Sequence, residues 1–224
     1  MLTFFVTASG TELGKTFVTA GLLRAYRAAG RKVAAIKPVM SGFDPADLAS
    51  SDAGRILEAA GGPVTPESVD AIAPWRFLTP ISPDMAAARE GREIDFDTLL
   101  HFCRQARTAS PDVLLIEAAG GVMAPLSPTR TMLDWAAELS HPALLVAGTY
   151  LGAISHALTA QTALRARGLP VAALIVSESG NNPVPPDETR ASLARHLPET
   201  QVCLLRRGAG AAAFGSLAAS LTQR

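Results

Sequence analysis

Residues 7–16 read Thr-Ala-Ser-Gly-Thr-Glu-Leu-Gly-Lys-Thr, and this stretch sets the expectations for the whole chain. An apolar run from Leu2 to Val6 precedes it, and an amphipathic helical pattern from about Lys15 to Ala29 follows it. A strand, a glycine-containing loop that ends in Gly-Lys-Thr, and a helix form the context of a phosphate-binding loop. The sequence therefore predicts a site for the phosphates of a nucleotide.

In such a loop, successive backbone N–H groups and the positive end of the following helix face the phosphate oxygens. Lys15 is expected to reach the β- and γ-phosphates, and the Thr16 hydroxyl is expected to ligate Mg²⁺. The strict pattern has glycine where this chain has Ser9, so Gly10 is expected to supply the tight backbone. The residues expected to bind nucleotide here are Gly10, Thr11, Glu12, Leu13, Gly14, Lys15 and Thr16. The alternative is an ordinary strand-to-helix turn that contains Gly-Lys-Thr by chance.

The composition favours one folded domain, residues 1–224, with no strong overall charge. A hydrophobic content of 48% excludes a disordered protein. The 20 Lys and Arg residues equal the 20 Asp and Glu residues, so no global field attracts nucleic acid or an anionic membrane. Cys103 and Cys203 predict no disulfide framework, which favours a reducing compartment. With no secretory signal and no apolar stretch of membrane-spanning length, we expect a soluble cytoplasmic protein.

Lysine is rare in this chain. Of the 20 basic residues 17 are arginine, and the lysines are Lys15, Lys32 and Lys37. The planar fork of arginine does not replace a compact ammonium on a phosphate. Lys37 ends a second apolar run, and ligands in parallel sheets bind beyond the carboxyl ends of the strands. Lys37 and the nearby Ser41 are therefore expected beside the phosphate loop.

Two acidic residues are candidates for further roles at this site. Glu117 directly follows a third apolar run and precedes Gly120-Gly121, where glycines let the backbone pass close to a ligand. We predict that Glu117 is a Mg²⁺-holding acid or a substrate-positioning residue rather than a solvated loop glutamate. Asp52 follows Ser51 at the start of a short predicted helix, and taken alone its expected role is helix capping.

The remaining chain alternates between apolar runs and helical patterns. Strands are expected at 33–37, 113–116, 143–147, 171–176 and 202–205, helices at 52–60, 84–90, 96–108, 132–139, 187–196 and 211–221, and mainly loop at 63–83. The stretch 148–155 opens a further helix to about Arg167, whose first turn could bind an anion such as a carboxylate. His156 on that turn is expected to be a hydrogen-bonded structural residue. The alternation predicts an α/β, three-layer P-loop NTPase fold with a mainly parallel sheet.

Taken together, these stretches resemble the dethiobiotin synthetase family, ATP-dependent enzymes of the P-loop NTPase superfamily that close the ureido ring before biotin. The resemblance extends from Phe5 to about Gly168 and fades after that. It rests on residues 10–16, Lys37-Pro-Val-Met-Ser-Gly42, Ser51-Asp-Ala53, Pro80-Ile-Ser-Pro83, Arg89-Glu-Gly91, Glu117-Ala-Ala-Gly-Gly121 and Leu151-Gly-Ala-Ile-Ser-His156. It implies a cyclo-ligase of biotin biosynthesis that uses ATP and Mg²⁺.

The resemblance also implies substrates, a mechanism and residue roles. One amine of 7,8-diaminopelargonate captures CO₂ as a carbamate, the carbamate takes the γ-phosphoryl group, and the second amine displaces phosphate. By resemblance Lys37, Lys15 and Thr11 are catalytic, and Thr16, Asp52 and Glu117 hold Mg²⁺. The substrate would contact Thr11, Glu12, Lys37, Ser41 and Gly120, with its carboxylate on the backbone of Gly152, Ala153, Ile154 and Ser155 across a homodimer interface.

Several positions depart from the family pattern. Ala8 and Gly10 replace a glycine and an aspartate of the loop, and Asp84 stands where the family has histidine. Ser177-Glu178 replaces an Asn-Asp pair whose asparagine contacts the adenine edge. A serine makes one or two hydrogen bonds where asparagine makes a matched pair. Ser177 is therefore expected at the base with weak discrimination among ATP, GTP and CTP.

Three alternative functions stay open from the sequence. A nucleotide-driven switch of the partition or cell-division ATPase type shares this fold, but it carries a signature lysine where this chain has Gly10. A ligase or amidotransferase-related synthetase acting on a larger acid is the second alternative. The third is a paralogue that binds nucleotide without reacting, because Ala8, Gly10 and Asp84 all depart from the family pattern.

Overall fold

The computed structural model describes residues 1–223, so Arg224, the last residue of the expected domain, lies outside it. The strands are β1 (Leu2–Ala8), β2 (Val33–Ile36), β3 (Val39–Ser41), β4 (Trp75–Phe77), β5 (Val113–Glu117), β6 (Ala143–Ala147), β7 (Val171–Ser177) and β8 (Val202–Leu205). The helices are α1 (Lys15–Ala28), α2 (Asp52–Ala60), α3 (Pro66–Ile72), α4 (Pro83–Arg89), α5 (Phe96–Gln105), α6 (Met132–Leu139), α7 (Ala153–Ala166), α8 (Pro186–His196) and α9 (Ala211–Thr222). No helix within residues 1–223 is both long and apolar enough to span a lipid bilayer.

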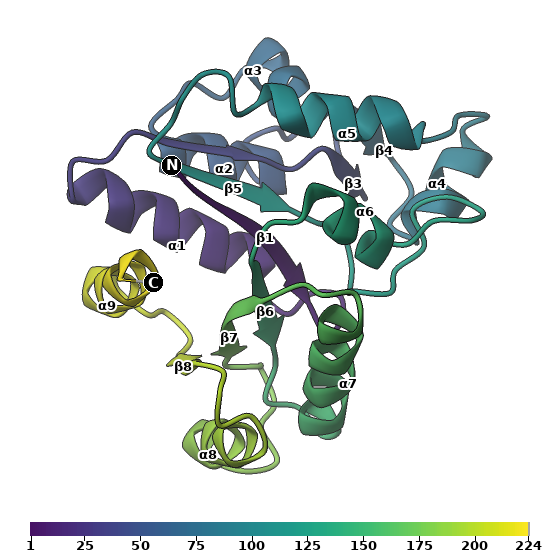
Figure 1. Cartoon of the computed structure of the whole chain (residues 1–224). Coiled ribbons are helices and arrows are strands. Elements are labelled where there is room, and N and C mark those ends of the chain that lie inside the picture. Colours follow the sequence, from purple (N-terminus) through teal and green to yellow (C-terminus); the bar gives the residue numbers. More distant parts are fainter. Residues whose placement is uncertain (224) are drawn as a thin grey trace.

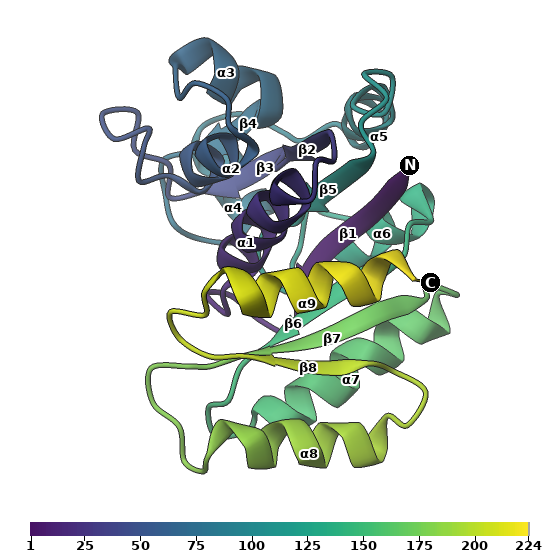
Figure 2. The ribbon, with the colours of Figure 1, turned by 90° about the vertical axis from the view of Figure 1, so that its left-hand side faces the viewer.

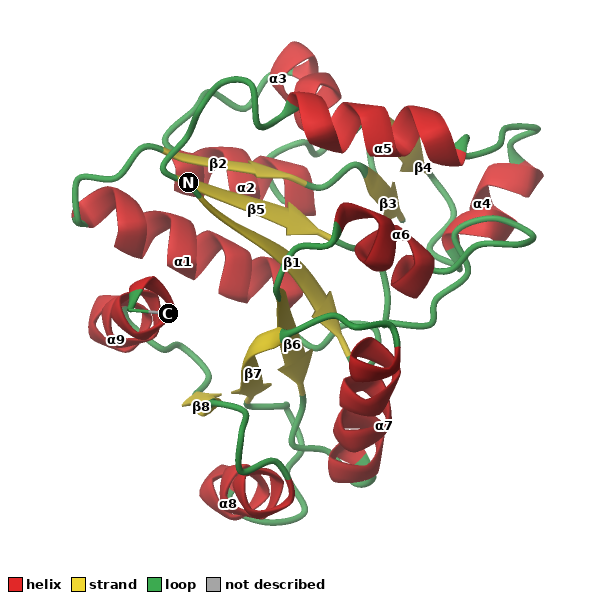
Figure 3. Cartoon of the chain, viewed as in Figure 1, coloured by secondary structure: helices red, strands yellow, loops and turns green. Residues whose placement is uncertain are grey.

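Six strands form one parallel sheet in the order β2-β5-β1-β6-β7-β8, with helices on both faces (Figures 1 and 3). β1 lies at the centre, where Phe5 is level with Ile116 of β5 and with Ala143 of β6. β5 separates β1 from β2, so the first two long strands are not neighbours. The predicted α/β fold with a mainly parallel sheet is confirmed.

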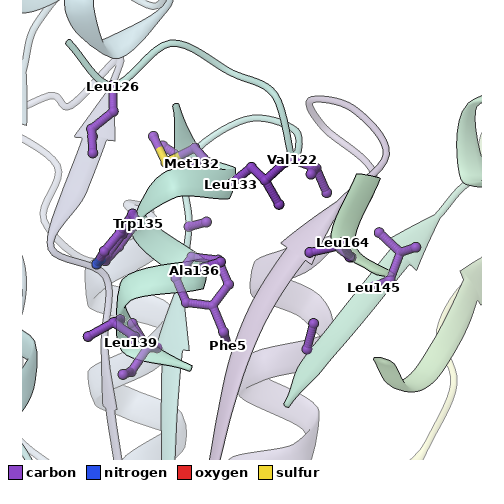
Figure 4. Packing of buried hydrophobic residues seen from close by; sticks show 14 of the residues in the cluster. Phe5, Val122, Leu126, Met132, Leu133, Trp135, Ala136, Leu139, Leu145 and Leu164 are labelled. Atoms are coloured by element: carbon purple, nitrogen blue, oxygen red, sulfur yellow. The ribbon is translucent and has the colours of Figure 1, made fainter. Parts of the chain in front are cut away.

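Alternate residues of β1 face opposite layers, as the two-residue period of a strand requires. Phe5 belongs to the hydrophobic cluster under α5, α6, α7 and α8, whereas Phe4 and Val6 belong to the cluster under α1, α2 and α9. In the first cluster the rings of Phe5 and Trp135 meet edge to face with centroids 4.9 Å apart (Figure 4). Burial on both faces explains why the central strands are continuous apolar runs.

The opposite face is covered by helices from both ends of the chain. α9 lies beside α1, although nearly the whole sequence separates them (Figure 2). Phe214 of α9 is packed so closely against α1 that a Cβ at Gly21 would lie 2.1 Å from its ring. This contact brings the Gly/Ala-rich tail next to the helix that follows the phosphate loop.

The expectation of a mainly irregular segment at 63–83 is wrong in part. This segment contains α3 and β4, and β4 pairs in parallel with β3 in a separate two-stranded sheet. Thr65 and Ser68 form a capping box with Pro66 in the first turn of α3, a position that tolerates proline because no N–H partner is lost there. Pro66 and Pro83 therefore begin helices and Pro74 directly precedes β4, whereas Pro63 and Pro80 lie in loop. α5 also ends at Gln105, earlier than the expected residue 108.

Candidate active site

The loop between β1 and α1 has the strained backbone that a phosphate cradle requires. Gly14 has a φ of 90°, and a Cβ on it would lie 2.8 Å from the Ser177 hydroxyl oxygen. Glu12 is a non-glycine residue with a φ of 58°. α1 then begins at Lys15 without a side-chain cap, which leaves its first N–H groups to an anion.

A second glycine-rich loop packs directly on the phosphate loop. A Cβ on Gly121 would lie 3.2 Å from both the backbone nitrogen and the Cα of Gly10. Gly120, with a φ of 64°, accepts a hydrogen bond of 2.6 Å from Lys15 Nζ through its carbonyl oxygen. The glycines after Glu117 therefore permit the close approach of two backbone loops around the Lys15 ammonium.

Lys37 lies between two carboxylates at the carboxyl edge of the sheet. Its Nζ donates to Asp52 Oδ2 at 2.5 Å and to Glu117 Oε1 at 2.7 Å. Thr16 Oγ1 donates to the same oxygen of Glu117 at 2.6 Å. The prediction that Lys37 lies beside the phosphate loop is confirmed. Glu117 is the last residue of β5, Lys37 directly follows β2, and Thr16 and Asp52 lie in the first turns of α1 and α2.

Burial and charge set the protonation of this cluster. Burial lowers the pKa of Lys15 to about 8, helped by the charge of Lys37 and opposed by the two carboxylates. Burial also acts against the charged form of Lys37, but attraction and hydrogen bonds to Glu117 and Asp52 outweigh it and raise its pKa. Burial acts against the Asp52 carboxylate too, yet Lys37 lowers the pKa of Asp52. Lys37 is therefore a fixed cation.

Asp52 does not cap α2, in contrast to the role expected from its position alone. The side chain of Ser51 occupies the capping position and accepts a hydrogen bond of 3.0 Å from the Gly54 N–H. Asp52 is the first residue of the helix, and its carboxylate points to Lys37 instead. Because Ser51 caps the helix, the Asp52 carboxylate is available to contact Lys37.

The oxygen donors around Lys37 suit Mg²⁺. Glu117 is fully buried, and its Oε2 has no hydrogen-bond partner. Thr16 and Asp52 add a hydroxyl and a second carboxylate within the same cluster. Within residues 1–223 no group of three or more His, Cys, Asp or Glu side chains could hold a metal alone. A bound Mg²⁺ would therefore need further oxygens from phosphates or water.

A cavity of about 660 Å³ opens beside Thr16, Lys37 and Asp52, whereas the fully buried Glu117 does not line it. It brings together most of the predicted nucleotide, metal and substrate residues, namely Thr11, Glu12, Leu13, Gly14, Lys15, Thr16, Lys37, Ser41, Asp52 and Gly120. Ser177 lines a smaller neighbouring cavity of about 250 Å³, beside Gly14. Gly10 lines neither cavity and lies in the loop backbone under Gly121. Most of the predicted site residues thus lie in one region.

The predicted anion site at the start of α7 lies outside this cavity. The set Gly152, Ala153, Ile154 and Ser155 does not line it. Gly152 has a φ of 94° and gives α7 no side-chain cap, and the preceding Leu151 is 85% exposed. His156 is hydrogen-bonded as predicted, with its Nδ1 2.7 Å from the Tyr150 hydroxyl.

Sequence reasoning missed several residues that line the cavities. Arg55 lies one turn after Asp52 on the same side of α2 and borders the larger cavity. Phe17 borders both cavities, and Arg206 and Arg207 border the smaller one. The three-residue spacing from Asp52 could have pointed to Arg55. Phe17 has the spacing of a core residue and carries no such signal.

The sequence and the fold are similar to those of known proteins. The family described as an AAA domain matches residues 2–207. The ATP-dependent dethiobiotin synthetase BioD of Acidiphilium cryptum is 52% identical over 88% of this chain and 89% of its own length. That of Phenylobacterium zucineum is 45% identical over 100% and 97%. Among solved structures, the MinC:MinD cell division complex of Aquifex aeolicus is similar in fold, with a TM-score of 0.63, 14% identity, and coverage of 100% of this chain and 96% of that one.

Proposed function

The chain belongs to the ATP-dependent dethiobiotin synthetase family, and from that premise we propose that it carboxylates and cyclises 7,8-diaminopelargonate to dethiobiotin with ATP. It is then a cyclo-ligase of biotin biosynthesis, with residues 1–224 acting as one P-loop domain. The observation that carries the proposal is the hydrogen-bonded cluster of Lys37, Asp52, Glu117 and Thr16 at the end of the phosphate loop.

The phosphates of ATP occupy the loop of residues 10–16, with Lys15 at the β- and γ-phosphates. Lys15 is buried and contacts the Gly120 carbonyl, so its ammonium needs little reorganisation to exchange that oxygen for a phosphate oxygen. Phosphate oxygens favour the charged form of Lys15, whose pKa is about 8 in the free site. The base extends past Gly14 toward Ser177.

Thr16, Asp52 and Glu117 hold Mg²⁺, which shields the negative charge of the β- and γ-phosphates. The unpartnered Oε2 of the buried Glu117 supports this assignment, because a buried carboxylate oxygen without a partner is otherwise costly. Asp52 and Glu117 already pair with Lys37 in the free protein, so part of the charge balance is in place.

The chemistry consists of two displacements. An oxygen of the substrate carbamate attacks the γ-phosphorus and ADP leaves. The second amine then attacks the carbonyl carbon of the carbamic-phosphoric anhydride, and phosphate leaves with the oxygen that came from the carbamate. Both nucleophile and γ-phosphate are anionic, so the protein must offset their repulsion. Lys37, whose Nζ lies between Asp52 and Glu117, supplies a positive charge beside the phosphate loop.

The diamine lies in the larger cavity against Thr11, Glu12, Ser41 and Gly120. Ser41 offers a buried hydroxyl that has no hydrogen-bond partner. The substrate carboxylate is bound by the backbone at the start of α7 of a second copy, in a homodimer. The exposed, uncapped start of that helix and its place outside the cavity of its own chain support this arrangement.

The decisive experiment supplies the protein with diaminopelargonate, Mg²⁺, ATP and bicarbonate labelled with ¹³C and ¹⁸O. Mass spectrometry should find dethiobiotin with ¹³C in the ureido carbonyl, together with one equivalent of ADP. Transfer of ¹⁸O into the released phosphate tests the anhydride separately. Phosphate without ¹⁸O, formed beside dethiobiotin that retains ¹⁸O in its ureido carbonyl, would contradict the anhydride but not the overall reaction, and the absence of dethiobiotin would contradict the proposed function.

A further inference from the structure

Phe17 is an aromatic residue in the first turn of α1, directly after the phosphate loop. It borders both cavities, although its place in the helix suggests a core residue. Its side chain is 38% exposed, whereas the next residue, Val18, is fully buried. A Cβ on Gly14 would lie 3.8 Å from Phe17 Cβ and 2.8 Å from the Ser177 oxygen. Phe17 and Ser177 therefore flank the point where a nucleotide passes from the loop into the smaller cavity.

The exposed ring is held in place by the last helix. The rings of Phe17 and Phe214 contact each other at a centroid distance of 5.2 Å and an angle of 72°. Phe214 is 5% exposed and packs against Gly21 of α1, where α9 runs beside that helix (Figure 2). Phe214 thus holds the partly exposed ring of Phe17 in position. This contact gives a role to the Gly/Ala-rich C-terminal segment, whose sequence contains no candidate catalytic residue.

The other side of the smaller cavity is fixed by hydrogen bonds between the loops after β7 and β8. Glu178 Oε2 accepts from the Arg207 backbone N–H at 2.9 Å, and the Glu178 N–H donates to the Leu205 carbonyl oxygen at 2.9 Å. The Arg207 guanidinium lies 3.2 Å from where a Cβ on Gly180 would be. One Glu178 oxygen is therefore occupied in holding the cavity wall.

We propose that Phe17, positioned by Phe214, is the residue against which the nucleobase stacks, and that stacking rather than edge recognition supplies the affinity for the base. This rests on the proposed function, which places a nucleotide in the loop. Ser177 offers one hydroxyl to the base edge, too little for a matched pair of hydrogen bonds. Every base has a π face, so stacking on an aromatic ring tolerates any base. Phe17 thus provides a physical reason for broad nucleotide use.

The test compares ligands that share the phosphates and differ in the base. Isothermal titration with Mg²⁺ should measure Kd for ATP, GTP, CTP and inorganic tripolyphosphate on the wild type and on Phe17→Ala. The variant should lose about tenfold to a hundredfold in affinity for each nucleotide. Its affinity for tripolyphosphate should stay within about twofold of wild type, because the loop and Lys15 are unchanged.

Two further variants keep the test decisive. Phe17→Leu keeps an apolar contact with Phe214 but removes the aromatic ring, so it can replace the alanine variant if that variant does not fold. It should weaken the binding of the nucleotides but not the binding of tripolyphosphate. Phe214→Leu should produce a smaller loss of the same kind if Phe214 positions Phe17. Equal losses for tripolyphosphate and ATP, or unchanged nucleotide affinity in Phe17→Leu, would overturn the proposal. Failure of wild type to bind ATP would instead contradict the proposed function.

Discussion

Lys37 is a buried cation held between two carboxylates. Its side chain is 5% exposed, and it contacts Asp52 and the completely buried Glu117. Replacing Lys37 with alanine should leave two acids near each other without their paired cation, at a cost of about 3 kcal/mol in unfolding free energy without Mg²⁺. Dethiobiotin formation should fall by at least about a hundredfold, because a charge at the transferred group is lost.

The measurements for Lys37→Ala are product formation by mass spectrometry, nucleotide affinity by titration, and melting temperature with and without Mg²⁺. Nucleotide binding should largely persist, since Lys37 lies outside the loop, and Mg²⁺ should raise the melting temperature more than in the wild type. Lys32→Ala is the matched control, because Lys32 is exposed in a turn. Near-normal turnover of Lys37→Ala would remove Lys37 from the mechanism.

Ser177 permits a second prediction at the scale of one residue. It is buried beside Gly14 and offers the base a single hydroxyl. The kcat/KM values for ATP, GTP and CTP should therefore lie within about tenfold of one another, a difference of about 1.4 kcal/mol. Steady-state kinetics with each nucleotide tests this. A preference for ATP of a hundredfold or more would show that other groups contact the base edge.

The residues that make up the site could be predicted from the sequence better than the contacts among them. The Gly-Lys-Thr stretch and the apolar runs that end at Lys37 and Glu117 indicated their convergence, because parallel strands end at one edge. The ion pairs of Lys37 with Asp52 and Glu117 could not be predicted, since they depend on side-chain directions at three elements. Phe17 was missed because an apolar residue after the loop has the same pattern whether it faces the core or a cavity.

At the scale of elements, long apolar strands were predictable and short ones were not. The inner strands of the central sheet, β5, β1, β6 and β7, are largely buried on both faces, which gives each a continuous apolar run. β3 and β4 have three residues each, and their pairing depends on contacts between segments far apart in sequence. Proline content misled the expectation at 63–83, although the Thr65-Pro66 pair is a helix-start signal.

α6 offers a test of how one helix start is stabilised. Asp134 accepts hydrogen bonds from the N–H and hydroxyl of Thr131 at 2.8 Å and from Arg167, beyond the end of α7, at 2.7 Å. Partial burial opposes the charged form, but these bonds outweigh it and lower the pKa of Asp134 to about 2. Asp134→Asn should therefore destabilise the protein at neutral pH by roughly 1 kcal/mol, allowing for the solvent exposure of Arg167.

The sign of the pH dependence follows from the direction of the shift. The pKa of Asp134 is lower in the folded protein than its ordinary value of 3.8, so its stabilisation is present above that value and disappears as pH falls toward about 2. Urea unfolding of wild type and Asp134→Asn at pH 7 and pH 3 should show a smaller difference at about pH 3. Asp97→Asn, in the exposed first turn of α5, is the control. An equal difference at both pH values would assign the effect to packing.

At the scale of the whole molecule, the two ends of the chain meet on one face of the sheet. Gly21 allows α9 to approach α1, because a Cβ there would lie 2.1 Å from the Phe214 ring. Gly21→Ala should therefore displace α9 and cost about 1–3 kcal/mol of unfolding free energy, even though alanine is the better helix former. Gly215→Ala on α9 meets open space and should instead stabilise the protein by about 0.5–1 kcal/mol.

This pair of variants also tests whether packing far from the phosphates reaches the nucleotide. Phe214 contacts Phe17, so displacing α9 in Gly21→Ala should weaken ATP binding several-fold while tripolyphosphate binding stays unchanged. Gly215→Ala should alter neither affinity. Denaturant unfolding gives the stabilities and titration gives the affinities. A Gly21→Ala protein that is destabilised but binds ATP with wild-type affinity would show that α9 covers the core without positioning Phe17.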